Sequence, residues 1–180
     1  MIDQLHLRVE TPAVIALGSN LGDREATLRA AVRDIAAIEG VVLLRASNLY
    51  ETPAVKPGGV DTDAPAYLNA VVAVRSALDP HDLLAALNAI ENAHGRVRQE
   101  RWGDRTLDLD IVSFGGQQLE TPDLTLPHPR AFERAFVLAP WLEVEPAAVV
   151  PGRATVGELL GELLGATGDV VTVYPAEPLL

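Results

Sequence analysis

The chain has 180 residues, a length that suits one domain with a hydrophobic core of its own. It contains no cysteine, which excludes a disulfide framework and a cysteine-based metal site. The formal net charge of −11 argues against a general nucleic-acid surface. The N-terminus is too polar for a signal peptide, and no apolar run has membrane-spanning length. We therefore expect a cytoplasmic protein that binds neither nucleic acid nor membrane.

Hydrophobic spacing predicts strands that alternate with helices along the chain. The first part contains four expected strands: Ala13–Leu17, Val41–Tyr50, Tyr67–Arg75 and Leu107–Phe114. One helix is expected after Asp23 with a stop at Gly40, and another begins at Asp79-Pro80 and ends at Gly95. Glu51–Pro65, with three prolines and two adjacent glycines, is expected to be a loop.

This order, β-α-β-β-α-β, predicts the α+β ferredoxin-like fold, with an antiparallel sheet and helices packed on one face. The C-terminal part adds two expected helices and a strand: Arg130–Leu142, Val156–Leu164 and Val170–Tyr174. Residues 1–12 are expected to form an N-terminal extension and residues 13–180 a single domain.

The strand Leu107–Phe114 carries two aspartates, although aspartate is depleted in strands. Because side chains alternate, Asp108 and Asp110 share one face, with Cα atoms roughly 6.5–7 Å apart. Carboxylates at this spacing can hold one or two hard cations. On their own, the two aspartates would more often form a solvated acidic face.

Arginines gather around this strand in an otherwise acidic chain: Arg96, Arg98, Arg101, Arg105, Arg130 and Arg134. Arginine offers planar, bidentate contacts to phosphate. A GC-rich coding sequence would explain arginine in place of lysine, but not the clustering. The cluster and the aspartates together predict a site for a metal and phosphates.

Other polar and aromatic residues allow two interpretations. Tyr67 and Asn69 share a strand face, which suits a flat heterocycle but is also common in ordinary sheets. Asn88 and Glu91 share a helix face, where Glu91 alone would be solvated. Trp102 could belong to the core or pack on a base or guanidinium. His128, between two prolines, could bind phosphate or cap a turn.

The segment Gly18-Ser19-Asn20-Leu21-Gly22 follows a strand and precedes a helix, as phosphate loops do. It lacks the Gly-Lys-Ser/Thr of a P-loop and the spacing of a dinucleotide fingerprint. We expect its glycines to make a tight turn.

Taken together, these segments resemble the 6-hydroxymethyl-7,8-dihydropterin pyrophosphokinase family. The similarity is collinear from about Val14 to Pro151, and its most specific part is Arg101-Trp102-Gly103 followed by Arg105-Thr106-Leu107-Asp108-Leu109-Asp110. The resemblance implies transfer of pyrophosphate from ATP to the hydroxymethyl group of the pterin, with release of AMP, in folate biosynthesis.

The resemblance also implies roles for individual residues. Asp108 and Asp110 would hold two Mg²⁺ ions, and Arg96 and Arg105 would act on the transferred phosphates. The pterin would contact Thr52, Pro53, Val55, Tyr67, Asn69 and Phe136. ATP would contact Asn88, Glu91, Arg98, Trp102, Ile111, Thr125, His128 and Arg134. A monomer is expected, with association with other folate-pathway enzymes left open.

Two other functions are compatible with parts of the sequence. A Mg²⁺-dependent phosphoryl or nucleotidyl transferase with a different acceptor would share the metal and arginine pattern, but not Thr52, Tyr67 and Asn69. A ferredoxin-like RNA-binding or regulatory module is disfavoured by the charge of −11 and by the lack of an RNP-like aromatic strand.

Overall fold

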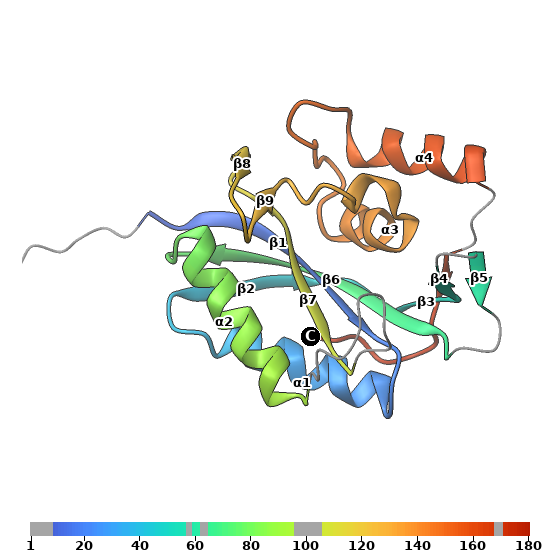
Figure 1. Ribbon diagram of the computed structural model, residues 1–180, viewed down its shortest axis with the longest axis horizontal. Helices are drawn as coiled ribbons and strands as arrows, with labels where there is room; N and C mark the ends of the chain where they lie inside the picture. The colour runs from blue at the N-terminus through green and yellow to red at the C-terminus, as the bar shows by residue number, and fades with distance from the viewer. Residues whose placement is uncertain (1–8, 57–58, 62–64, 96–105, 168–170) are drawn as a thin grey trace, which may run out of the picture.

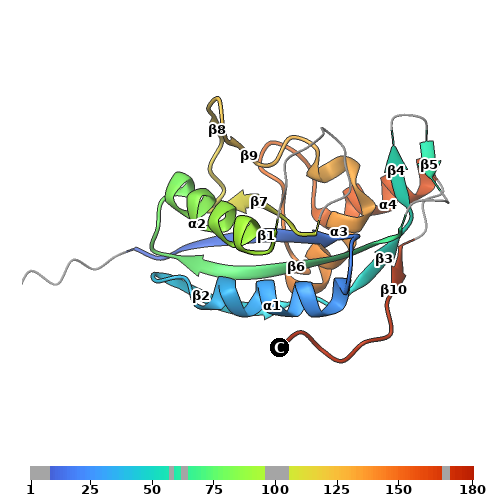
Figure 2. The ribbon, with the colours of Figure 1, turned by 60° about the horizontal axis from the view of Figure 1, so that its bottom comes forward.

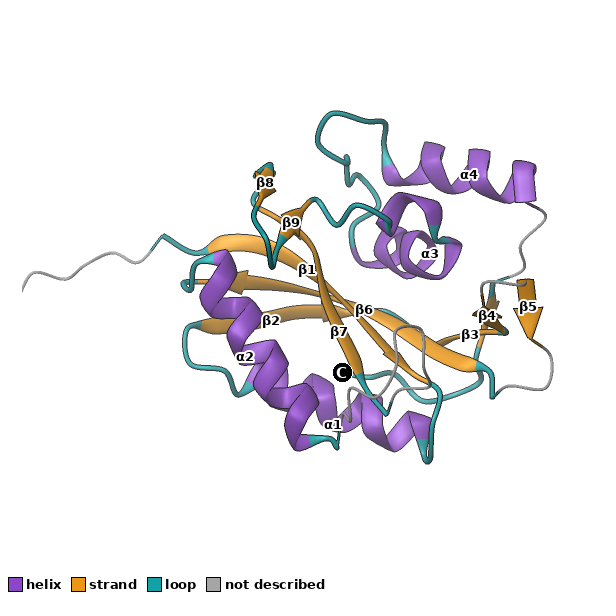
Figure 3. Cartoon of the chain, in the orientation of Figure 1, coloured by secondary structure: helices purple, strands orange, loops and turns teal. Residues whose placement is uncertain are grey.

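The computed structural model describes residues 9–56, 59–61, 65–95, 106–167 and 171–180 (Figure 1). Strands and helices alternate along these ranges, as Figure 3 shows. The main sheet is built from β1 Thr11–Ser19, β2 Val41–Ala46, β3 Tyr50–Thr52, β6 Tyr67–Ser76, β7 Asp108–Phe114 and β10 Thr172–Val173.

The sheet has the strand order β10-β3-β6-β1-β7, with β2 also paired to β6, and every pairing is antiparallel. Its central strands run β2-β6-β1-β7. They are connected through α1 Arg24–Ala36 and α2 Pro80–Ala93 in the chain order β1-α1-β2-β6-α2-β7. The ferredoxin-like arrangement predicted from the sequence is therefore confirmed.

Helices cover both faces of the sheet (Figures 1 and 2). α1 and α2 pack on one face, where β1 contributes Ile15 and Leu17 to the core. α3 Ala135–Val144 and α4 Val156–Thr167 lie on the other face, where β1 contributes Val14. The sequence predicted that the two helices of the core share one face, and α1 and α2 do so (Figure 1). It did not assign a face to the C-terminal helices, because helical periodicity does not show which side of a sheet a helix covers. Among the described helices, none has the length and hydrophobicity needed to span a membrane.

Both predicted helix starts are confirmed by their caps. Asp23 accepts a hydrogen bond from the Ala26 N–H at 3.0 Å, and Asp79 accepts from the N–H groups of His81 and Asp82, both at 2.9 Å. These bonds satisfy backbone donors that have no partner inside the helix. α1 ends at Ala36, earlier than predicted, and Gly40 adopts φ +84° in the turn that enters β2.

The predicted strand Val41–Tyr50 is interrupted between β2 and β3. Ser47 breaks the regular ladder: its N–H donates to the Val71 carbonyl at 2.9 Å, and its hydroxyl accepts from the Val71 N–H at 3.0 Å. The prediction that Glu51–Pro65 forms a loop is wrong in part. This segment contains the end of β3 and a hairpin of two short strands, β4 Ala54–Lys56 and β5 Gly59–Asp61.

The C-terminal region differs from the prediction in its boundaries. The expected helix Arg130–Leu142 is divided into the 3₁₀ turn η1 Ala131–Glu133 and α3. A short hairpin of β8 Leu119–Glu120 and β9 Thr125–Leu126 precedes it. β10 is shorter than expected, and α4 is three residues longer. At the other end, residues 11 and 12, expected in an extension, pair with β6.

The last residues return along α1 (Figure 2). The Arg29 guanidinium donates to the carbonyls of Glu177 and Pro178 at 2.6 and 2.8 Å. The Tyr174 N–H donates to the Leu49 carbonyl at 2.8 Å. The C-terminal segment is therefore attached to the α1 side of the sheet.

Candidate active site

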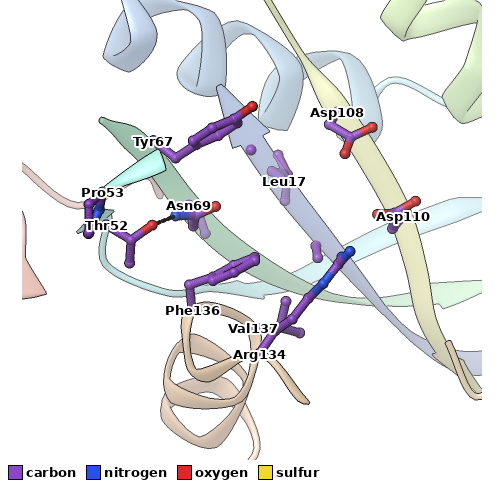
Figure 4. Close-up of a pocket in the computed structure, with 13 residues that line it drawn as sticks. Leu17, Thr52, Pro53, Tyr67, Asn69, Asp108, Asp110, Arg134, Phe136 and Val137 are labelled. Atoms are coloured by element: carbon purple, nitrogen blue, oxygen red, sulfur yellow. Dashed lines mark hydrogen bonds between the residues drawn. The ribbon is translucent and has the colours of Figure 1, made fainter. Parts of the chain in front are cut away.

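One pocket brings together most of the described residues that the sequence singled out (Figure 4). It opens on the sheet face that carries α3, beside the N-terminal turn of that helix. Its lining residues come from β1, the end of β3 and the residue after it, β6, β7, and the N-cap and first turn of α3: Ala16, Leu17, Gly18, Thr52, Pro53, Tyr67, Asn69, Ala70, Asp108, Asp110, Arg134, Phe136 and Val137.

The floor of the pocket is a row of residues across three paired strands. Gly18 of β1 lies opposite Asn69 of β6 on one side and opposite Asp108 of β7 on the other. A Cβ atom at Gly18 would lie 3.4 Å from the Asn69 Oδ1, so a side chain here would be in contact with the amide. The prediction of a tight turn is wrong for Gly18, which lies inside β1. It is correct for Gly22, which adopts φ +65° where the chain turns.

A buried pair of polar side chains forms one side of the floor. The Asn69 amide donates from Nδ2 to the Thr52 hydroxyl at 2.9 Å, and both residues are buried. The Asn69 Oδ1 lies toward Gly18, which also lines the pocket. Thr52 and Asn69 therefore present a fixed polar edge, which suits hydrogen bonding to the rim of a heterocycle.

Two aromatic rings stand on opposite sides of Asn69 in Figure 4. Tyr67 comes from β6 and Phe136 from α3, and both are half-buried pocket residues. The Arg134 guanidinium lies 5.7 Å from the centre of the Phe136 ring, within the range of a cation–π contact. A flat ring could enter between Tyr67 and Phe136 with its polar edge toward Asn69.

Asp108 and Asp110 lie on β7 at the other side of the pocket (Figure 4). They are opposite Gly18 and Ala16 of β1, and both are partly exposed. Leu109, between them, is buried against α1 and α2, as the predicted alternation requires. The two aspartates do share a face that opens on the pocket.

The chemistry of these donors fits a hard cation such as Mg²⁺. Among the described residues no group of three or more candidate metal-binding side chains occurs. A pair of carboxylates suits Mg²⁺, which keeps several water ligands and shares phosphate oxygens with its substrate.

His128 approaches this carboxylate pair from the segment after β9. Its Nε2 lies 3.9 Å from Asp110 Oδ2, and its Nδ1 accepts a hydrogen bond from the Arg130 N–H at 3.2 Å. Burial, followed by the positive charge of Arg134, lowers the His128 pKa to about 4, although Asp108 acts in the opposite direction. At neutral pH the ring is therefore uncharged, with its proton on Nε2, on the side of Asp110.

Glu91 of α2 is buried, which excludes the alternative of a solvated residue on the helix surface. Its Oε1 accepts a hydrogen bond from the Leu109 N–H at 2.7 Å. Leu109 separates Asp108 from Asp110, so Glu91 fixes the backbone that carries both carboxylates. A direct contact of Glu91 with ATP stays a prediction, as does that of Asn88, which is half-buried one turn earlier on α2.

Two further candidates lie away from the pocket lining. Ile111 is 2% exposed and packs in the core on the α1 and α2 side, so any contact with ATP would come from its backbone. Thr125 is half-buried on β9, opposite Glu120. Four candidates lie outside the described residues: Arg96, Arg98, Trp102 and Arg105. The side chain of Val55 lies outside them as well.

Five residues that line the pocket were not predicted from the sequence to contact a ligand: Ala16, Leu17, Gly18, Ala70 and Val137. Their contribution depends on how β1, β6 and α3 lie beside one another. The small size of Ala16 and Gly18 was the available signal, since space above a sheet requires small residues in its floor.

Comparison with known proteins gives a consistent result. The family model for 7,8-dihydro-6-hydroxymethylpterin-pyrophosphokinase matches residues 14–146. The 2-amino-4-hydroxy-6-hydroxymethyldihydropteridine pyrophosphokinase of Methylorubrum extorquens is 45% identical over 153 residues, which cover 85% of this chain and 94% of that protein. The protein of the same name from Bacillus subtilis is 46% identical over 132 residues, which cover 73% and 77%.

The fold has solved counterparts. The crystal structure of a Plasmodium falciparum HPPK-DHPS triple mutant aligns with a TM-score of 0.66 at 16% identity, covering 89% of this chain. This chain spans 46% of that one, so the likeness is to a part of it and concerns the fold alone. The sequence matches carry the stronger conclusion, and on them the chain belongs to the 7,8-dihydro-6-hydroxymethylpterin pyrophosphokinase family.

Proposed function

We propose that the protein transfers the terminal pyrophosphoryl group of ATP to the hydroxymethyl group of 6-hydroxymethyl-7,8-dihydropterin, a step of folate biosynthesis. The acceptor oxygen forms a bond to the β-phosphorus, and the bond from that phosphorus to the oxygen shared with the α-phosphate breaks. The products are AMP and the pterin diphosphate, and the hydroxyl proton is released. One observation carries this proposal: a single pocket contains two aromatic rings, the polar edge of Asn69 and Thr52, and a pair of carboxylates.

The pterin ring would enter between Tyr67 and Phe136. Its amide and amino edge would face Asn69 and Thr52, whose mutual hydrogen bond fixes their orientation before the ligand arrives. Such preorganisation lowers the entropy lost on binding. The hydroxymethyl group would then extend toward β7, on which Asp108 and Asp110 lie.

Asp108 and Asp110 would hold Mg²⁺, and we expect two ions for each ATP. When bound, the ions neutralise charge on the transferred phosphates. Arg134 and the neutral His128 border the same region and would contact the triphosphate from the α3 side. The catalytic roles of Arg96 and Arg105, and the ATP contacts of Arg98 and Trp102, rest on the family resemblance and stay predictions.

A product assay tests the reaction. The protein is incubated with ATP, Mg²⁺ and the reduced pterin alcohol, and the nucleotide products are separated by chromatography. AMP together with the pterin diphosphate supports pyrophosphoryl transfer. ADP would reject it in favour of a phosphoryl transferase with the same metal site, and turnover that does not require the pterin would reject this acceptor.

We also propose that the chain acts as a cytoplasmic monomer, which light scattering coupled to gel filtration would check. Association with other enzymes of the same pathway is a further proposal. Its support is that the Plasmodium falciparum structures are named as HPPK-DHPS proteins of about twice this length.

A further inference from the structure

The carboxylate of Glu143 connects two elements that form different walls of the pocket. Glu143 lies on α3, and its Oε2 accepts a hydrogen bond from the Tyr50 hydroxyl at 2.8 Å. Its Oε1 accepts from the backbone N–H and the side-chain amide of Asn48, at 3.0 and 2.9 Å. Three donors at the start of β3 thus converge on one carboxylate. We call these contacts the Glu143 bridge.

On the β3 side the bridge continues directly into the pocket. Tyr50 is the first residue of β3 and lies opposite Asn69 of β6. Thr52 is two residues further on, so it shares a strand face with Tyr50. The Thr52 hydroxyl accepts the hydrogen bond from Asn69. A displacement of Tyr50 would therefore move the polar edge of the pocket.

On the α3 side the bridge reaches Phe136. Phe136 precedes Glu143 by seven residues, about two helical turns, so both side chains lie on the same side of the helix. Pro140 lies between them and has no N–H to donate to the Phe136 carbonyl. With this helical bond missing, the position of the turn that carries Phe136 depends more on contacts outside the helix.

A second contact holds the same end of α3. The Arg45 guanidinium of β2 donates to the Val144 carbonyl at 3.1 Å. That contact attaches the helix to the sheet but does not involve β3. The Glu143 bridge, in contrast, connects α3 to the strand that carries Thr52.

We propose that Glu143 is a positioning residue for the acceptor: its bridge to Tyr50 and Asn48 holds α3 where Phe136 and Thr52 contact the same flat ring. This inference rests on the proposed function. Glu143 is exposed and does not line the pocket itself, so it acts through the elements it joins.

The protonation of Tyr50 agrees with this geometry. Burial, followed by the hydrogen bond to Glu143 and its negative charge, raises the pKa of Tyr50 to about 12. The phenol therefore remains a hydrogen-bond donor throughout the neutral range, as the bridge requires.

The test uses two shape-conserving variants and a matched control. Glu143→Gln removes the charge and one acceptor oxygen, and Tyr50→Phe removes one donor. Glu145→Gln is the control, because Glu145 is two residues away and accepts a hydrogen bond from Trp141 Nε1, at the end of its own helix. Binding of the pterin alcohol and of ATP with Mg²⁺ is measured by calorimetry, and turnover at saturating substrates is measured separately.

We expect Glu143→Gln and Tyr50→Phe each to raise the pterin Kd about five- to tenfold, with the ATP Kd and the saturated rate nearly unchanged. The double variant should be no weaker than the worse single variant, because both remove the same bridge. Glu145→Gln should bind the pterin normally. Equal weakening of both ligands, an unchanged pterin Kd, or the same loss in Glu145→Gln would overturn the proposal.

The same measurements separate this inference from the proposed function. An unaltered protein that binds no pterin would reject both. Pterin binding that is insensitive to Glu143→Gln and Tyr50→Phe would reject the inference alone. Alkaline titration of tyrosinate absorbance gives an independent readout: the group that titrates near pH 12 should move toward 10 in Glu143→Gln. No movement would show that the bridge is not formed.

Discussion

The two aspartates of β7 illustrate how much a single residue position can determine. Both lie in a strand yet remain partly exposed, because their side chains point to the pocket while Leu109 points to the core. Two like charges at this spacing repel each other when no cation is bound. They are therefore expected to serve binding and catalysis rather than stability.

Asp110→Asn should lower turnover by roughly two to three orders of magnitude, since it removes a charged ligand for Mg²⁺ while keeping the shape of the side chain. The free energy of unfolding should change by less than about 1 kcal/mol. Steady-state kinetics and urea denaturation would check both expectations. Glu162→Gln, an exposed carboxylate on α4, is the control. Kept activity with a large loss of stability would show a structural role instead.

Asn69→Ala should weaken pterin binding by about ten- to a hundredfold, because a buried polar edge would lose its hydrogen bonds to the ring. ATP binding should remain nearly intact, since Asn69 lies across Gly18 from the carboxylates. Calorimetry with each ligand separately would measure this difference. The exposed Asn92→Ala on α2 should affect neither ligand. Similar losses for both ligands would mean that Asn69 mainly supports the sheet.

His128 should make stability depend on pH in the acidic range. Its pKa is about 4 in the folded protein and about 6.5 when unfolded. Between these pH values the unfolded chain binds a proton at His128 that the folded chain does not. The free energy of unfolding is therefore highest above pH 6.5 and decreases as the pH falls toward 4. The loss should be on the order of 3 kcal/mol, and smaller in His128→Gln.

Urea denaturation at several pH values would measure that dependence. The imidazole resonance that disappears from the NMR spectrum in His128→Gln should titrate near pH 4 in the unaltered protein. A resonance that titrates near 6.5 would contradict the lowered pKa of His128.

At the scale of elements, α2 and β7 are joined by a buried carboxylate. Glu91→Ala would leave the Leu109 N–H without this acceptor and would open space in the core. We expect it to reduce the free energy of unfolding by about 3 kcal/mol and to lower turnover as well, because Asp108 and Asp110 flank Leu109. Glu91→Gln keeps an acceptor oxygen and should retain more stability. A neutral result in denaturation experiments would show that this hydrogen bond is dispensable.

At the scale of the whole molecule, the C-terminal segment returns to the α1 side of the sheet, opposite α3 and α4. Tyr174, Ala176 and Leu179 pack against the core there, and Arg29 of α1 binds two of the segment's carbonyls. Removal of residues 174–180 should therefore lower stability by about 2 kcal/mol, mainly through exposed apolar surface. Thermal unfolding would check this.

Arg29→Gln should show a smaller loss than the truncation, because it removes the hydrogen bonds but leaves the apolar contacts. Arg33→Gln, an exposed position one turn further along α1, should be nearly neutral. A truncated protein as stable as the full chain would mean that the segment contributes nothing to the fold.

The sequence by itself determined the features that depend on near neighbours. Asp23 and Asp79 mark helix starts because a cap acts within three residues. Alternation along β7 places Asp108 and Asp110 on one face because successive side chains of a strand point to opposite sides. These local rules, with the resemblance, were enough for the fold class and for most of the described pocket residues.

Only the tertiary structure decided which residues meet across elements. Gly18 lies between Asn69 and Asp108 because of the register of three strands, and Glu91 is buried because α2 packs against β7. The placement of α3 on the second face of the sheet brings Phe136 over the pocket and Glu143 to Tyr50. Periodicity and capping act over a few residues, whereas register and packing depend on contacts between residues far apart in the chain, which no local pattern encodes.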